Sequence, residues 1–297
     1  MNILIIGHSV VDKIIERNII TTKPGGIFYS VIALLSQHQS GDKIFLCSSI
    51  DNENESLFSE IYNRVEKNFL TYANFIPEVE LTIKDFGERE EKYSRLANNL
   101  SIPDAGYNLF DGILINMISG NDISIDQLKQ IRKNFNGLIY FDVHTFSRGA
   151  DENLKRIFRR INNFNEWAEC IDILQANESE LTTLSDRTDE SHIAEELISY
   201  GINQVIVTKA EHGATVYFKE KSVIKNFHNN AIRTNVLNKV GCGDIFGAVY
   251  FNNYIKNKDV TLALKLANML AGISTTVTEA RSLSNLNYYA DEWISKK

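Results

Sequence analysis

Short apolar runs recur along the chain and alternate with segments of helical periodicity. The apolar runs predict strands buried on both faces and cover residues 2–7, 43–50, 112–117, 138–143, 171–176 and 204–208. The helical patterns cover residues 27–37, 56–67, 125–135, 153–164, 245–256 and 260–276. Strands that alternate with helices are typical of βαβ units, so the pattern predicts an α/β fold built on a parallel sheet.

Two regions depart from this pattern. Residues 78–86 alternate polar and apolar side chains, which predicts a half-exposed strand in a small sheet outside the main one. Residues 214–218 and 222–227 predict a pair of antiparallel strands at the edge of the main sheet. We therefore expect a small accessory sheet beside a large, mainly parallel one.

Length and composition are those of a soluble globular protein. The chain has 297 residues, of which 43% are hydrophobic and 23% charged. No apolar run reaches the roughly 18 residues of a membrane helix, and the opening residues predict a first strand rather than a signal peptide. Because no Pro/Gly linker or repeat divides the chain, we expect a single domain over residues 1–297.

Charge and cysteine content narrow the classes of function. A net charge of −7 argues against broad nucleic-acid binding, for which a basic surface is expected. It does not argue against a small anionic ligand held in a local pocket. Cys47, Cys170 and Cys242 lie far apart and show no metal-ligand spacing, which fits a reducing cytoplasm.

The segment Gly241-Cys242-Gly243-Asp244 precedes an apolar helical run. Glycine permits a tight turn, and the N–H groups at the start of a helix attract anions. An equally consistent interpretation is a capped helix after a glycine turn, with Asp244 as the N-cap. The segment alone leaves both interpretations open.

Other candidates for ligand contacts lie near the ends of predicted elements. Asp12 follows the first strand, where open α/β sheets bind ligands, and is either a solvated acid or an acceptor for substrate hydroxyls. Gly25 and Gly26 precede a predicted helix and indicate either close ligand approach or a plain turn. Small residues beside Asn268 would let the last helix lie close to its neighbour or to a planar ligand.

In this order the segments resemble the ribokinase-like, or PfkB, family of small-molecule kinases over nearly the whole chain. The motifs that carry the resemblance are Pro24-Gly25-Gly26, the Asn-x-x-Glu pair Asn177 and Glu180, the strand-end loop from Thr208 to Gly213, and Gly241-Cys242-Gly243-Asp244. The resemblance implies a doubly wound α/β fold, with a mostly parallel sheet flanked by helices. It also implies a small β lid, formed by segments near residues 10–22 and 78–100.

The resemblance further implies transfer of a phosphoryl group from ATP, with Mg²⁺, to a hydroxyl of a sugar or nucleoside. Asp244 is then the general base, and the N–H groups of Gly241, Cys242 and Gly243 bind the transferring phosphoryl group. Cys242 is interpreted as a small residue and not as a nucleophile. The expected contacts are Asp12, Gly25, Gly26 and Ser30 for the substrate, and Thr208, Lys209, Gly213, Lys239 and Asn268 for ATP.

Asn177 and Glu180 lie one helical turn apart, and the resemblance gives them the role of ordering Mg²⁺ through water. The alternative is a helix start in which Asn177 caps and Glu180 occupies the third position. As partners we expect a small sugar or nucleoside, no nucleic acid and no membrane, with a homodimer formed through the lid. The expected location is the cytoplasm.

Several positions depart from the family pattern. Asn238 and Lys239 stand where the family has Asp-Thr, and Ser30 replaces a common asparagine. Lys209-Ala210 replaces the usual Leu-Gly, and the segment from Asp142 to Arg148 replaces an Asp-Pro-Asn motif. Most of these changes fall on the substrate side and the ATP rim, so they bear on the substrate more than on the reaction.

Two functions remain open from the sequence. The first is an ATP-dependent carbohydrate or nucleoside kinase, which Asp244 favours. The second is a kinase-like protein that binds a small ligand with weak or no turnover, which the changes at Lys239 and Ala210 keep open. A dinucleotide-binding dehydrogenase is disfavoured, because the first strand ends in Gly7-His8-Ser9-Val10 without the Gly-x-Gly-x-x-Gly turn.

Overall fold

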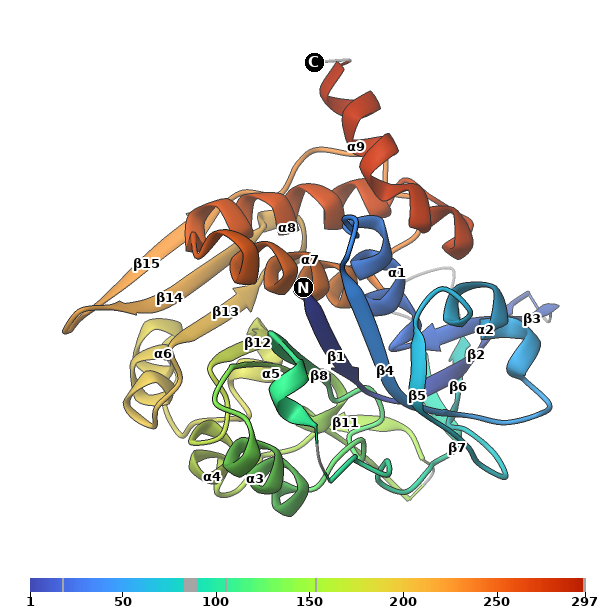
Figure 1. Cartoon of the computed structure of the whole chain (residues 1–297), viewed down its shortest axis with the longest axis horizontal. Coiled ribbons are helices and arrows are strands. Elements are labelled where there is room, and N and C mark those ends of the chain that lie inside the picture. Colours follow the sequence, from blue (N-terminus) through green and yellow to red (C-terminus); the bar gives the residue numbers. More distant parts are fainter. Residues whose placement is uncertain (18, 83–89, 105, 153, 296–297) are drawn as a thin grey trace.

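A nine-stranded sheet forms the centre of the computed structural model, which describes residues 1–17, 19–82, 90–104, 106–152 and 154–295 (Figure 1). In spatial order its strands are β15 (Val223–Asn229), β14 (Ala214–Glu220), β13 (Gln204–Thr208), β12 (Ile173–Asn177), β9 (Leu138–Asp142), β8 (Gly112–Asn116), β1 (Asn2–Ile6), β4 (Lys43–Ile50) and β5 (Glu66–Tyr72). All pairs from β13 to β5 are parallel, and β14 and β15 add antiparallel pairs at one edge. The predicted α/β fold with a mostly parallel sheet and an antiparallel edge pair is confirmed.

Helices cover both faces of this sheet (Figure 1). They are α1 (Phe28–Ser36), α2 (Glu55–Tyr62), α3 (Ile125–Asn134), α4 (Phe164–Ala168), α5 (Glu178–Leu181), α6 (Glu190–Ser199), α7 (Cys242–Asn257), α8 (Val260–Ser274) and α9 (Leu286–Ser295). Ile3 and Ile5 of β1 pack in the core with α1, α7 and α8, whereas Leu4 and Ile6 pack in the core with α3 and α6. Because the central strands face two helical layers, their sequences are apolar without alternation.

A separate four-stranded sheet contains β3 (Ile19–Gly26), β2 (Ser9–Glu16), β6 (Glu78–Thr82) and β7 (Glu90–Arg95), in that order. We call it the small sheet. Val79 and Leu81 are buried while Glu80 is half-buried, so the predicted alternation is confirmed for β6. The rest of that predicted strand, residues 83–86, lies outside the described residues. Gly25 and Gly26 belong to β3, not to the predicted turn, because β3 pairs antiparallel with β2 along its whole length.

The predicted helix over residues 153–164 is wrong for the residues that the structure describes. β11 (Arg156–Phe158) pairs antiparallel with β10 (Arg148–Ala150), and α4 begins only at Phe164. The backbone N–H of Tyr93 donates to the carbonyl of Leu154 at 2.9 Å, which joins this hairpin to the small sheet. These tertiary contacts override a helical periodicity that is a weak local preference. Residue 153 lies outside the described residues.

Smaller differences concern element ends. α2 ends at Tyr62, before the predicted residue 67, because the chain enters edge strand β5 at Glu66.

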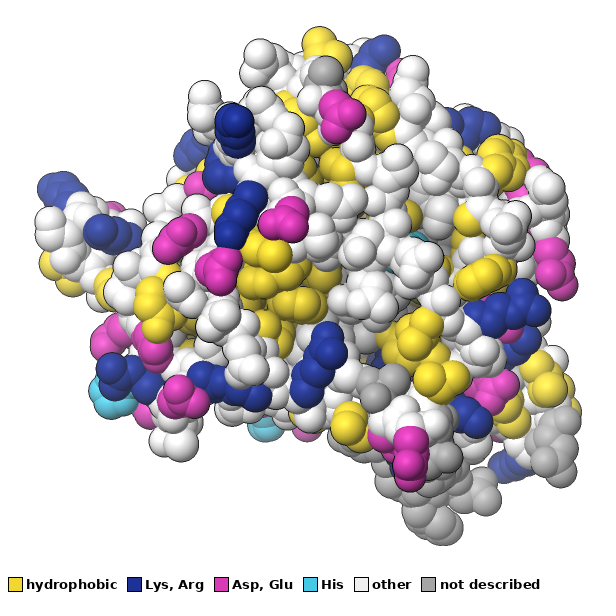
Figure 2. Space-filling view, turned by 90° about the horizontal axis from the view of Figure 1, so that it is seen from below, with side chains coloured by type: hydrophobic (Ala, Val, Ile, Leu, Met, Phe, Trp, Pro, Cys, Tyr) yellow, Lys and Arg dark blue, Asp and Glu magenta, His cyan; other side chains and the backbone are white. Residues whose placement is uncertain are grey.

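Among the described residues, no helix is both long and apolar enough to cross a membrane. Acidic and basic side chains are interspersed on the face seen from below (Figure 2).

Candidate active site

Polar side chains gather where neighbouring parallel strands end. The last residues of β8, β9, β12 and β13 are polar: Asn116, Asp142, Asn177 and Thr208. Asp12 lies on β2, which follows β1. The chain runs from β1 to β4 and β5 and then returns to β8 on the other side of β1. Open α/β sheets form their binding crevices at such a reversal of direction.

Asp244 lies in the first turn of α7 and is 8% exposed. Its Oδ1 accepts a hydrogen bond from Asn116 Nδ2 at 3.1 Å, and the same Nδ2 donates to Ser30 Oγ at 2.8 Å. Burial raises the pKa of Asp244 to about 7, and the nearby acids Asp12 and Glu180 raise it too, whereas the Asn116 hydrogen bond lowers it. A carboxyl group with such a pKa can accept a proton near neutral pH.

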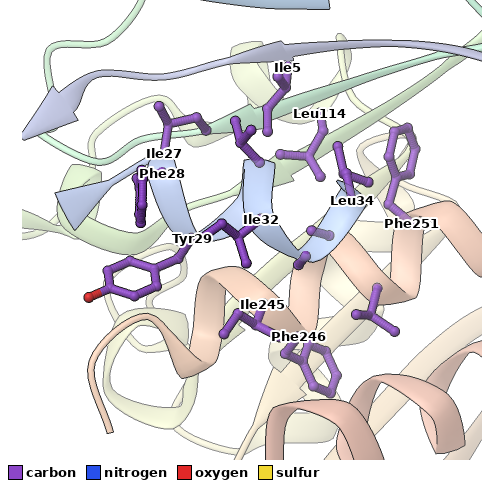
Figure 3. Close-up of a cluster of buried hydrophobic side chains, with 14 of the residues drawn as sticks. Ile5, Ile27, Phe28, Tyr29, Ile32, Leu34, Leu114, Ile245, Phe246 and Phe251 are labelled. Carbon is purple, nitrogen blue, oxygen red and sulfur yellow. The ribbon is translucent and has the colours of Figure 1, made fainter. Parts of the chain in front are cut away.

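Gly241 and Gly243 both lie at the start of α7, but the space around their Cα atoms differs. Gly241 has φ +76°, and an added Cβ would lie 2.2 Å from the ring of Tyr29, which projects from α1 toward this turn (Figure 3). At Gly243 an added Cβ would meet only a Gln175 nitrogen, at 3.9 Å. Gly241 is the N-cap, so the interpretation of Asp244 as the N-cap is wrong; Asp244 is the third residue of the helix.

Cys242 is the first residue of α7 and packs against α8. Its Sγ lies 3.4 Å from the carbonyl oxygen of Ala271, and burial raises the pKa of the thiol to about 11. Its backbone N–H donates to the carbonyl of Lys239 at 3.4 Å, at the upper limit for such a bond. A protonated thiol is a poor nucleophile, which supports the interpretation of Cys242 as a small packing residue.

Asp12 and the glycine pair lie side by side at the base of the small sheet. An added Cβ on Gly25 would lie 2.3 Å from Asp12 Oδ2, so only glycine leaves room for this carboxylate. Gly26 has φ +66°, and its added Cβ would lie 2.4 Å from the carbonyl oxygen of His8. Asp12 is 8% exposed and lies close enough to Asp244 to raise its pKa.

A cavity of about 110 Å³ connects these groups. It is lined by Asp12, Asp244, Gly241, Arg148 and Arg156, together with apolar residues of the small sheet. Ser30 is fully buried beneath this surface and bonded to Asn116. Ser30 therefore orients Asn116 in this structure, and its predicted contact with substrate stays a prediction.

Asn177 and Glu180 form a capping box at the start of α5. Glu180 N–H donates to Asn177 Oδ1 at 2.8 Å, and Asn177 N–H donates to Glu180 Oε2 at 2.9 Å. The other carboxylate oxygen, Oε1, lies 3.6 Å from Arg148 Nη2. Burial raises the pKa of Glu180 to about 7. The alternative capping interpretation is confirmed, and the predicted role toward Mg²⁺ stays a prediction.

Asp142 is a further buried acid beside Asp244. Its Oδ2 accepts a hydrogen bond from Gln175 Nε2 at 3.1 Å, and the same nitrogen donates to the carbonyl of Gly243 at 3.2 Å. Burial raises the pKa of Asp142 well above its ordinary value, and the negative charges of Glu180 and Asp244 raise it further. Gln175 thus links the end of β12 to the glycine turn that precedes Asp244.

The predicted ATP contacts divide into two groups. Lys209 forms an ion pair with Glu190 of α6 at 2.8 Å, and its backbone N–H donates to the carbonyl of Gly213. Asn268 donates to the carbonyl of Asn229, at the end of β15. Thr208 is half-buried where β13 ends, and Lys239 is exposed on the loop before α7. Thr208, Lys209, Gly213 and Asn268 are tied to the edge strands, and Lys239 lies beside the glycine turn.

Comparison with known proteins shows a family that part of the chain resembles. Residues 147–286 match the model of the pfkB family carbohydrate kinases. Over these residues the chain resembles the ribokinase-like (pfkB) family. A segment of 110 residues is 33% identical to the deoxyribokinases of Salmonella typhi and Salmonella typhimurium and covers 35% of this chain and 35% of each relative. The match therefore spans about a third of the length of these curated relatives.

The ribokinase fold extends over nearly the whole chain. Arabidopsis thaliana ribokinase, complexed with ribose and ATP, has a TM-score of 0.75 and 18% identity, over 97% of this chain and 98% of that one. A pyrophosphate-dependent kinase in the ribokinase family, complexed with a pyrophosphate analog and myo-inositol, has a TM-score of 0.77 and 16% identity, over 97% and 100%. At these identities the likeness shows the fold alone.

Four residues at this site were not singled out from the sequence: Asn116, Gln175, Glu91 and Arg156. Asn116 ends one apolar strand, and Gln175 lies within another. An amide in such a strand can be recognised from the sequence as a candidate site residue, because buried polar groups need hydrogen-bond partners. Glu91 and Arg156 carry no such signal. They come from the small sheet and from the hairpin that replaced a predicted helix, and only the fold brings them together.

Proposed function

We propose that the protein transfers the γ-phosphoryl group of ATP to a hydroxyl of a small polyhydroxylated substrate, a sugar or a nucleoside. The observation that carries this proposal is Asp244, a buried acid with a pKa of about 7 at the first turn of α7. It shares one cavity with Asp12, a carboxylate suited to hydroxyl groups. The family match and the deoxyribokinase relatives support the same reaction class.

In the proposed reaction Asp244 accepts the proton of the substrate hydroxyl as that oxygen attacks the γ-phosphorus. The bond from phosphorus to the β–γ bridging oxygen breaks, and ADP leaves with that electron pair. The N–H groups of Gly241, Cys242 and Gly243 at the start of α7 stabilise the phosphoryl oxygens. Asn116 holds the carboxylate that acts as base, and Ser30 holds Asn116.

Asp12, Gly25 and Gly26 are proposed to bind the substrate beneath the small sheet, which acts as the lid of a single domain. The absence of a side chain at Gly25 lets the Asp12 carboxylate lie against the backbone. A carboxylate accepts hydrogen bonds from substrate hydroxyl groups, and each hydrogen bond to a charge contributes about 1.5–3 kcal/mol.

The residues near Asp244 fit a Mg²⁺ ion held through water. Asp142, Glu180 and Asp244 lie close enough for their negative charges to raise pKa values within the group, and a cation would relieve that repulsion. Within the described ranges no group of three or more His, Cys, Asp or Glu side chains is arranged to hold a metal directly. Mg²⁺ commonly keeps several waters, so Asn177 and Glu180 would orient those waters. When bound, the ion neutralises charge on the donor phosphates.

ATP is proposed to lie along the ends of β13 and β14, against Thr208, Lys209, Gly213 and Asn268. Asn268 fixes the backbone at Asn229, and a side chain at position 213 would collide with that same backbone. The exposed Lys239 precedes the glycine turn, where its charge can meet a donor phosphate.

A homodimer through the lid is also proposed. Ile19 and Ile20 on edge strand β3 are 69% and 64% exposed, and an edge strand with exposed apolar side chains favours pairing with another chain. Sedimentation of wild type and of an Ile19→Lys, Ile20→Lys double variant tests it. The proposal predicts a dimer that the double variant converts to monomer, and a monomeric wild type would contradict it.

Incubation with Mg²⁺ and ATP and a panel of sugars and nucleosides tests the proposed reaction. We expect acceptor-dependent release of ADP together with a phosphorylated product identified by mass spectrometry. Pyrophosphate in place of ATP serves as a second donor arm, because a structurally similar kinase is pyrophosphate-dependent. Ligands that bind without any phosphorylated product would favour the alternative, a kinase-like binding protein without turnover.

A further inference from the structure

Two arginines of the β10–β11 hairpin line the cavity that holds Asp12 and Asp244. Arg148 lies at the start of β10 and Arg156 at the start of β11, and their side chains are 23% and 9% exposed. The Arg156 guanidinium lies over the ring of Tyr93 at 4.6 Å, and that of Arg148 lies over Phe158 at 4.9 Å. Stacking fixes the planes of both guanidinium groups before any ligand binds.

Both guanidinium groups retain an unused donor. The Nε atoms of Arg148 and Arg156 are buried and have no hydrogen-bond partner within the described structure. A buried donor left unsatisfied costs about 1–3 kcal/mol, and more when the group is charged. Two such donors on one hairpin, in side chains that line one cavity, leave this cluster short of acceptor groups.

The acids Asp12, Glu91 and Asp244 line the same cavity as the two arginines. Glu91 Oε2 lies 2.7 Å from Arg156 Nη1 and 3.4 Å from Arg148 Nη1, so one carboxylate serves two guanidinium groups. Glu180 Oε1 lies 3.6 Å from Arg148 Nη2, so it is a second acidic contact of this arginine. Burial, and then the two arginines, lower the pKa of His144 to about 3, so this cavity-lining imidazole adds no charge of its own.

We propose that the acceptor substrate carries an anionic group, a carboxylate or a phosphate, which Arg148 and Arg156 bind. The substrate class is therefore a sugar acid or a sugar phosphate, with hydroxyl groups held by Asp12 and one of them presented to Asp244. This inference rests on the proposed function of the same cavity. Arginine suits the role because its planar donor set matches carboxylate and phosphate oxygens.

A purely structural role for the cluster explains less of it. One arginine is enough to pair with Glu91 and to join the hairpin to the small sheet, and Arg156 does both through Glu91 and Tyr93. Arg148 makes the longer contact to Glu91 and remains more exposed to the cavity. The oxygens of a carboxylate or phosphate accept charge-assisted hydrogen bonds from a guanidinium group, and these are stronger than the hydrogen bonds that a neutral hydroxyl accepts.

Binding to wild-type protein tests the proposal without requiring turnover. Calorimetry would compare matched sets built on pentose and hexose skeletons, each containing the neutral sugar, its aldonic acid and its terminal phosphate ester. We expect at least one anionic member to bind about 10-fold or more tightly than its neutral counterpart. The acid and phosphate arms show which anion is bound. Neutral sugars that bind as well as or better than both anionic forms in every set would overturn the proposal.

Arg148→Gln, with Arg159→Gln as the matched control, locates the anion. Arg159 is an exposed arginine just beyond the same hairpin. We expect Arg148→Gln to remove about 10-fold or more of the preference for the anion while leaving neutral-sugar binding and the KM for ATP unchanged. A rise in the KM for ATP alone would place the guanidinium at the donor and overturn the proposal. Arg156→Lys supplies a second variant should Arg148→Gln fail to fold.

Different results would contradict the anion site and the proposed reaction. Anion-selective binding without a phosphorylated product would leave the anion site standing and contradict the proposed reaction. Phosphorylation of neutral sugars only would leave the reaction standing and contradict the anion site.

Discussion

Removal of the Asn116 side chain should shift the pH at which Asp244 acts as a base. Asn116 Nδ2 donates to Asp244 Oδ1 at 3.1 Å, and this hydrogen bond lowers a pKa that burial raises to about 7. A hydrogen bond to a charged group contributes about 1.5–3 kcal/mol, and one pKa unit corresponds to about 1.36 kcal/mol. Asn116→Ala should therefore raise the Asp244 pKa by roughly 1–2 units.

The sign of the effect follows from the proposed role. A base acts when deprotonated. The value of kcat/KM is therefore highest above the Asp244 pKa and decreases as the pH falls through that pKa. The acid limb for Asn116→Ala should move to higher pH by roughly 1–2 units, with a roughly 5–50-fold loss at pH 7 that alkaline pH restores.

The assay is the pH profile of kcat/KM for wild type, Asn116→Ala and a control, Asn134→Ala. Asn134 is exposed at the end of α3, far from the cavity residues, and its variant should leave the profile unchanged. An acid limb that coincides with that of wild type in a folded Asn116→Ala protein would show that Asn116 does not set the Asp244 pKa. A loss of activity that is equal at every pH would show the same.

The remaining predictions concern the metal, the glycine turn and the substrate carboxylate. Glu180→Gln should raise the Mg²⁺ concentration for half-maximal rate, whereas Glu178→Gln on the same helix should not; equal Mg²⁺ dependence would leave Glu180 as a capping residue only. Gly241→Ala should lower the melting temperature, since a left-handed Cβ costs about 1–2 kcal/mol before the steric clash with the neighbouring ring. Gly243→Ala should be tolerated in the same melting experiment, and equal effects at both glycines would contradict the turn geometry. Asp12→Ala should raise the KM for the acceptor with the KM for ATP unchanged, and the opposite pattern in steady-state kinetics would contradict its placement.

Much of the fold was predictable because buried parallel strands have a distinct sequence pattern. The apolar runs located the central strands to within a residue or two, and βαβ alternation placed their carboxyl ends at one edge. The two glycines also predicted the turn before Asp244, because glycine permits the backbone angles of a tight turn. The edge strand β5 was not predicted, because its exposed polar residues lack an apolar run.

The arginine cluster was not predictable in the same way. Arg156 lay in a segment with helical periodicity, and its position depends on pairing of β10 with β11 and on contacts with Tyr93. Glu91 reaches Arg156 from 65 residues away in the chain, through the small sheet. A single sequence records local periodicity, whereas such a cluster depends on which distant segments meet.

The central claim is that Asp244 is the base of a phosphoryl transfer, and the turnover of Asp244→Asn tests it most directly. Asparagine keeps the size of the side chain and an oxygen that accepts the Asn116 hydrogen bond, but it cannot take the proton. Asp259→Asn, which alters the exposed N-cap of α8, is the matched control. We expect kcat to fall by roughly 10²–10⁴-fold with ATP and acceptor binding retained, while the control keeps wild-type turnover. Near wild-type kcat in Asp244→Asn would contradict this claim.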